Sequence, residues 1–364
     1  MKSNPRIALI DYLRLTASIC VCISHVLGAL RDTQHILSPL NEAFRITIIF
    51  RVPLLFAISG FVVYLSIRDK PKSFSSVFHF LSRRWVWILI PLCLALSFTY
   101  CYEKMLWLNG FPHVPQRAPI DVISNILCVT SFTNTRRWIE PTWSLAYELQ
   151  YYLITALVWI STFIRTARQE TGLHVQISVL TLILSSVILS THYQVDGLGI
   201  WHIRWFALGL LVGLRFSHIK YAWGFRLSIL IVGIASIIEG VVILVTTKLL
   251  LLIGILLFTE TDGLRSVDKL LRTSPILGTV SYLIYLFHWP IASHSGALVQ
   301  FCRSIGLHDD YWPLFAILFP IVLSVVISKP VFHLCNWASQ LLAATNQNKS
   351  LLIKKTRQTY DPFR

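Results

Sequence analysis

Long apolar stretches recur along almost the whole chain, and they constrain the fold more than any other feature. Those long enough to cross ~30 Å of hydrocarbon as helices lie at 8–30, 43–67, 78–100, 143–164, 174–191, 200–216, 225–245, 247–259, 276–301 and 311–343. They predict ten helices. The 225–259 region also fits a single long helix with a frayed end, since Glu239 and Gly240 lie inside a continuous apolar run; the even count would then be lost.

Composition excludes a set of soluble domains. Hydrophobic residues make up 55% of the 364 residues and charged residues only 13%, which is typical of a polytopic membrane protein. We therefore expect an all-α membrane helical bundle, with residues 1–345 forming one integral membrane domain and 346–364 a basic cytoplasmic tail. The longest polar segment, 101–142, is expected to lie outside the membrane and to cap an entrance.

Basic residues test the helix count, because they accumulate in short cytoplasmic loops. With the amino terminus inside, the inside segments carry more than twice as many lysines and arginines as the outside segments. This distribution predicts that both termini are cytoplasmic. It also accounts for the net charge of +15, so no nucleic-acid partner is expected.

The seven cysteines show no paired or metal-ligand spacing, and Cys20, Cys22 and Cys93 fall within apolar runs. Buried free thiols are the favoured interpretation. The sequence therefore predicts no metal site.

Arg14 and His25 are ionisable residues inside the first apolar stretch. Such groups in lipid usually mark a function. Eleven residues is close to three helical turns, so both side chains leave the same helix face, roughly 16 Å apart along the axis. We expect His25 to lie well across the bilayer and Arg14 near the cytoplasmic side, an arrangement that suits a reaction supplied from both sides of the membrane.

Polar groups also interrupt four later apolar segments, at 51–61, 83–91, 142–152 and 278–290. Together with Arg14 and His25, and in this order, these segments resemble the acyltransferase-3 family of multi-pass membrane enzymes. The resemblance covers roughly residues 8–300, and the ordered set is far more specific than any single motif.

The resemblance implies a bacterial inner-membrane O-acyltransferase. Its donor would be cytoplasmic acyl-coenzyme A, usually acetyl-coenzyme A as co-substrate, and its acceptor a hydroxyl of a sugar or lipid-linked glycan on the other side. His25 matches the family's catalytic candidate, and imidazole has a suitable intrinsic pKa for removing a hydroxyl proton. Covalent acyl-imidazole formation and direct transfer both stay open.

Arg14, Arg83 and Arg84 fall on the predicted cytoplasmic side, where guanidinium groups would bind the phosphates of the donor. The alternative for Arg83 and Arg84 is an ordinary positive-inside anchor. For Arg14 the alternative is an ion pair with Asp11, with the side chain extending to the membrane interface. Donor binding and this alternative are compatible.

Ser144, Glu148 and Tyr152 recur every four residues and share one stripe of their helix. That stripe is expected to face the bundle interior, where Glu148 would orient the His25 imidazole as a second catalytic residue. The alternative is a buried carboxylate held by Arg204 or by a tyrosine hydroxyl.

Ser59, Tyr285 and His288 are expected to line the same site. Ser59-Gly60 lacks the surroundings of a serine nucleophile and is interpreted as close helix packing with a hydrogen bond near the donor. For His288 the plain alternative is a histidine that bonds a carbonyl freed near Pro290.

A rival function is a transporter or exporter of polysaccharide intermediates, since ten helices with buried charges also describe many permeases. The absence of repeat symmetry and the clustering of ionisable residues in the motif segments argue against it. A third possibility is an inactive family member in a synthesis complex. The acceptor, the acyl chain length and the oligomeric state leave no mark in the sequence.

Overall fold

A computed structural model describes residues 7–33, 38–71, 73–110, 118–164, 171–192, 197–217, 222–238, 276–308 and 311–359, with a few single positions between 248 and 274. Every regular element in these ranges is helical: α1 (Ala8–Thr33), α2 (Ser38–Ile67), α3 (Phe74–Leu108), α4 (Pro119–Ile126), α5 (Thr130–Thr133), η1 (Glu140–Thr142), α6 (Trp143–Ile164), α7 (Thr171–His192), η2 (Gly199–Trp201), α8 (Ile203–Ser217), α9 (Ala222–Ile238), α12 (Leu277–Ala292), α13 (Ser295–Ser304) and α14 (Trp312–Thr359).

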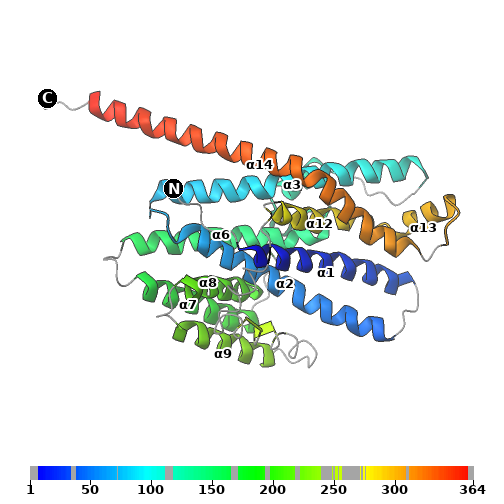
Figure 1. Ribbon diagram of the computed structural model, residues 1–364, viewed down its shortest axis with the longest axis horizontal. Coiled ribbons are helices and arrows are strands. Elements are labelled where there is room, and N and C mark those ends of the chain that lie inside the picture. Colours follow the sequence, from blue (N-terminus) through cyan, green and yellow to red (C-terminus); the bar gives the residue numbers. More distant parts are fainter. Residues whose placement is uncertain are drawn as a thin grey trace.

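The long helices run roughly along one axis of an elongated bundle (Figure 1). Within the described residues, three helical segments are long and apolar enough to cross a membrane, namely Ala8–Ala29, Phe74–Leu108 and Trp312–Ala344. Shorter apolar helices occupy Arg51–Ile67, Gln176–Leu189 and Trp223–Ile238. The all-α class is confirmed, whereas the count of ten spans and the cytoplasmic position of both termini stay predictions.

The last two apolar stretches differ from the sequence expectation. The stretch at 276–301 forms two helices, because α12 ends at Ala292 and the turn at Ser293 and His294 separates it from α13. Pro290 lies in the last turn of α12, where its missing N–H weakens the helix end. Helix α14 continues to Thr359, through most of the segment expected as a basic tail.

Parts of the sequence predictions fall outside the described residues. They include the two ends of the chain, 1–6 and 360–364, and most of the stretch at 247–259. The loop at 111–117 in the middle of the long polar segment is also outside them.

Glycine contacts bring α2 and α8 into close packing. A Cβ atom on Gly60 of α2 would lie 2.0 Å from the Phe206 carbonyl oxygen, and one on Gly209 of α8 would lie 1.9 Å from that of Ala57. Small residues of this kind let two helix backbones approach closely. The packing predicted for Ser59-Gly60 is therefore observed, and it places α2 between α8 on one side and α1 on the other.

A buried asparagine organises the short helices between α3 and α6. The Asn125 side chain donates to the carbonyls of Asp121 and Arg136, both at 2.8 Å, and accepts a hydrogen bond from the Trp138 backbone N–H at 3.0 Å. The bonds to Arg136 and Trp138 satisfy backbone groups that lie outside the helices. They also hold the segment that leads into η1 against α4.

Candidate active site

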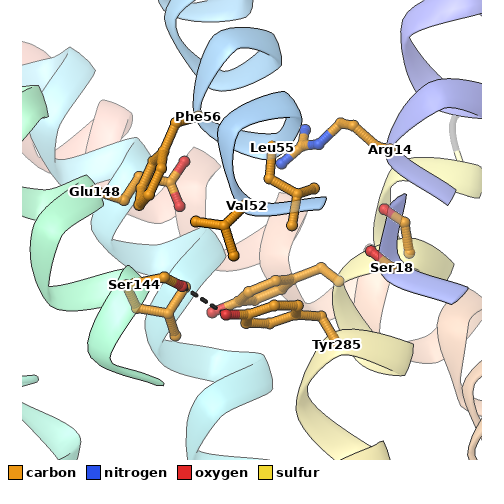
Figure 2. Close-up of a pocket in the computed structure, with 11 residues that line it drawn as sticks. Arg14, Ser18, Val52, Leu55, Phe56, Ser144, Glu148 and Tyr285 are labelled. Atoms are coloured by element: carbon orange, nitrogen blue, oxygen red, sulfur yellow. Dashed lines mark hydrogen bonds between the residues drawn. The ribbon is translucent and has the colours of Figure 1, made fainter. Parts of the chain in front are cut away.

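A narrow pocket opens where α1, α2, α6 and α12 meet (Figure 2). Its volume is about 50 Å³. Polar groups enter it from three of these helices, with Arg14 and Ser18 on α1, Ser144 and Glu148 on α6, and Tyr285 on α12, while α2 contributes apolar side chains. Figure 2 shows Arg14 and Glu148 approaching it from different helices, with Val52 and Leu55 between them in this view.

Glu148 is held by two hydroxyl groups. Ser59 of α2 and Tyr152, one turn further along α6, both donate to its Oε1 atom. The hydroxyl oxygens of Ser59 and Tyr152 are themselves 3.3 Å apart. We call Ser59, Glu148 and Tyr152 the carboxylate network. It confirms that a tyrosine hydroxyl binds this carboxylate, as one of the two interpretations of the sequence expects, and it joins α2 to α6.

Arg84 and Arg83 point to different surroundings. The Arg84 guanidinium donates to Ser66 Oγ at 2.9 Å and lies 5.4 Å from the centre of the Tyr152 ring, within the range of a cation–π contact. Arg83 is exposed. Arg84 therefore reaches the carboxylate network from α3, whereas Arg83 keeps the position of a surface anchor.

Tyr285 connects the pocket with the next group of residues. Its hydroxyl lies 2.6 Å from Ser144 Oγ and donates to the Pro141 carbonyl at 2.7 Å; the contact with Ser144 is drawn in Figure 2. The centre of its ring lies 6.2 Å from that of His288, one turn further along α12.

His25 stacks on His288. Their ring centres are 5.2 Å apart with an interplanar angle of 28°, and Trp289 meets the His25 ring edge-on at 5.1 Å. We call His25, His288, Trp289 and Arg51 the histidine cluster. Because α1 and α12 each supply one histidine, the extensive contact between these two helices is what forms it.

His288 is fully buried. Its Nδ1 atom lies 3.1 Å from the Ile284 carbonyl oxygen, and since a carbonyl only accepts, Nδ1 carries the proton and Nε2 is left as an acceptor. Among the described residues Nε2 has no hydrogen-bond partner. Pro290 has no N–H group, so the carbonyl that it leaves unbonded in the helix is that of Leu286. His288 bonds the Ile284 carbonyl instead. The alternative interpretation, a histidine that bonds the carbonyl freed near Pro290, therefore accounts for only part of what is observed.

Arg51 of α2 begins the motif segment 51–61, but the sequence assigned it no role in the site. Its Nη1 atom donates to the Val21 carbonyl of α1 at 3.3 Å, and its Nε atom is buried without a partner among the described residues. The charge distribution counts Arg51 as a loop residue. The signal that identifies Arg14, a cation inside an apolar run, would also have identified Arg51.

The structure thus brings the predicted site residues together in two groups. In the first group, the pocket is lined by Arg14, Ser144, Glu148 and Tyr285, and Ser59 and Tyr152 bond Glu148. In the second group, His288 contacts His25. The hydrogen-bonding partners observed for Glu148 are hydroxyl groups, whereas His25 contacts aromatic rings. In the described part of the chain, no three His, Cys, Asp or Glu side chains gather as metal ligands.

This arrangement offers an imidazole, a second imidazole with an open nitrogen, and a guanidinium with a free N–H, next to a small polar pocket. An imidazole can take a proton from a hydroxyl or attack a carbonyl carbon itself. Buried N–H donors can stabilise negative charge that develops on an oxygen. The chemistry that fits this set is acyl transfer.

Comparison with known proteins gives one match of high coverage. A family model described as an acyltransferase domain matches residues 7–331. No curated protein and no solved structure matches the chain.

Proposed function

The chain belongs to the acyltransferase-3 family and is a membrane acyltransferase, and we propose that it transfers acetyl from cytoplasmic acetyl-coenzyme A to a hydroxyl of an extracytoplasmic sugar or glycan. The observation that carries this proposal is the position of His25. It stacks on His288, and Tyr285 links this pair to the pocket that Arg14 lines.

His25 is the proposed catalytic base. It removes the proton of the acceptor hydroxyl as that oxygen attacks the thioester, or it attacks the thioester itself to form an acyl-imidazole. Stacking on one ring and edge contact with another restrict the imidazole to one orientation. A fixed orientation favours catalysis because the reacting atoms meet without a further loss of rotational freedom.

The pocket supports acetyl as the acyl group. Its volume of about 50 Å³ is well below the roughly 300–1,000 Å³ of pockets that enclose a whole ligand. It therefore has room for the short acyl end of a donor, and the nucleotide has to bind outside it. Arg14 and Arg84 are the proposed ligands of the donor phosphates, with Arg84 best placed because it also contacts Tyr152, whereas the exposed Arg83 is proposed as a positive anchor at the surface.

Glu148 is proposed to support the reaction from the pocket wall. The two hydroxyl donors hold the carboxylate in place, and its negative charge lies in a pocket that Arg14 also lines. A fixed carboxylate in a water-poor site influences nearby charges strongly. We propose that it stabilises the charged form of His25.

Several finer features of the proposal come from the family resemblance. They are the bacterial inner membrane as location, a multi-pass bundle with cytoplasmic termini, and a polysaccharide precursor as acceptor. Separate access from the two sides of the membrane is consistent with Arg14 and His25 being three turns apart on α1.

Turnover of radiolabelled acetyl-coenzyme A by the purified protein in liposomes tests the function. We expect thioester cleavage by the wild type and its loss, by about 100-fold or more, in His25→Ala, since acid–base catalysis contributes roughly 10²–10⁴ in rate. His333→Ala is the matched control, because His333 is exposed on α14. Full activity of folded His25→Ala would contradict the proposal, and no turnover by folded wild type would favour an exporter of polysaccharide intermediates.

A further inference from the structure

Arg51 places a positive charge beside the proposed catalytic histidine. It lies on α2 one residue before Val52, which lines the pocket. Its Nη1 atom is fixed on the Val21 carbonyl, and Val21 is one helical turn before His25 on α1. The guanidinium interacts electrostatically with His25, His288 and Tyr285. The bond to Val21 therefore places Arg51 near the His25 end of α1.

The Val21 carbonyl holds Arg51 in a defined place. This oxygen belongs to the backbone of α1, and it also accepts a hydrogen bond from the Ser24 hydroxyl at 2.8 Å. The carbonyl is a neutral partner, so the bond orients the guanidinium without neutralising it. An arginine stays charged in a protein, and the positive charge remains available to a substrate.

The Nε–H group of Arg51 is an open donor. It is buried, and no described atom accepts a hydrogen bond from it. An unmade bond of this kind costs free energy, roughly 1–3 kcal/mol or more for a charged group. Buried polar groups are normally paired, so an open donor on Arg51 and an open acceptor, Nε2 of His288, in the same cluster indicate a place that a substrate completes.

We propose that Arg51 is a catalytic residue whose Nε–H donates a hydrogen bond to the carbonyl oxygen of the acyl group as negative charge develops on it. The inference rests on the proposed function, because it needs an acyl donor at His25. It differs from the phosphate-binding role proposed for the other arginines, since it assigns Arg51 to the reacting oxygen.

In direct transfer, the acceptor oxygen bonds to the thioester carbon while His25 takes the hydroxyl proton. The electron pair of the C=O bond moves onto the carbonyl oxygen, and Arg51 stabilises this oxyanion. The C=O bond then forms again, the C–S bond breaks, and His25 returns the proton to the leaving thiolate. The products are the acyl ester and coenzyme A.

The test compares Arg51→Met with the wild type in liposomes. We expect kcat to fall about 100-fold or more, as for the loss of one oxyanion donor. Binding of S-ethyl-coenzyme A, a thioether that lacks the thioester carbonyl oxygen, is expected to stay within about twofold, because only the developing charge depends on Arg51. Arg137→Met is the control, since it removes a guanidinium whose observed partner is Glu140.

Arg51→Lys keeps the test valid where Arg51→Met does not fold. It retains the charge but has no N–H at the Nε position, and we expect kcat to fall about 10-fold or more at an unchanged melting temperature. Turnover of either folded variant close to the wild-type rate overturns the inference. So does a loss of S-ethyl-coenzyme A binding large enough to explain the loss of turnover. Inactive wild type would instead refute the proposed function.

Discussion

The carboxylate network and the histidine cluster are both polar groups within an apolar bundle, but their hydrogen bonding differs. Glu148 receives bonds from Ser59 and Tyr152, and Arg84 covers the Tyr152 ring. In the histidine cluster, two buried atoms, Nε2 of His288 and Nε of Arg51, have no partner in the described part of the chain.

This difference separates the structural role from the chemical one. A network whose hydroxyl groups are paired stabilises the contact between two helices, because it avoids the cost of unmade bonds. An incomplete cluster costs stability and is retained where a substrate supplies the missing bonds. We therefore expect substitutions in the histidine cluster to affect turnover most, and substitutions in the carboxylate network to affect stability more.

His288→Phe gives the largest expected effect among the tests of this comparison. Phenylalanine keeps a ring to stack on His25 but removes the open Nε2 atom, so kcat should fall on the order of 100-fold with little change in melting temperature. Turnover assays and thermal unfolding in detergent measure the two quantities. A lower melting temperature with unchanged kcat would make His288 a packing residue and remove the contrast.

Glu148→Gln is expected to lower the free energy of unfolding by about 1–3 kcal/mol, because a half-buried acceptor of two hydroxyl bonds is altered. We expect kcat to fall only about 10-fold, corresponding to about 1.4 kcal/mol. Unfolding in denaturant and turnover test this, with Tyr152→Phe as a milder change in the same network. A loss as large as that of His25→Ala, at unchanged stability, would place Glu148 in the chemical step itself.

Arg84→Gln and Arg83→Gln form a matched pair on α3. Arg84 contacts Ser66 and Tyr152, so its loss should raise KM for acetyl-coenzyme A about fivefold, the equivalent of ~1 kcal/mol. Arg83 is exposed, and its loss should change KM by less than about twofold. Equal effects of the two substitutions would show that position on the surface, and not contact with the network, decides donor binding.

Tyr285→Phe is the mildest test, because it changes only the link between the two regions. The ring that contacts His288 stays, and the hydroxyl that bonds Pro141 and Ser144 is removed. We expect a loss of about 1 kcal/mol in stability and a fall in kcat of no more than about threefold. A fall as large as that of His288→Phe would mean that the hydroxyl takes part in the reaction and that the two regions act as one.

The features that depend on local sequence were predicted correctly. Helix class follows from the length of the apolar stretches, and the shared stripe of Ser144, Glu148 and Tyr152 follows from the helical repeat, which the bond between Glu148 and Tyr152 confirms. The family match over 7–331 likewise agrees with the order of the motif segments. Each of these needs only neighbours along the chain.

The sequence by itself thus determined an all-helical membrane acyltransferase with a histidine and an arginine on one face of its first helix. Only the tertiary structure decided which groups meet: Ser59 with Glu148, His288 with His25, and Arg51 with the Val21 carbonyl. The physical reason is that contacts between helices depend on their relative depth and rotation. Close packing sets the depth and the rotation, through features such as the Gly60–Phe206 approach and the contact of α1 with α12. The periodicity of a single helix carries no information about either quantity.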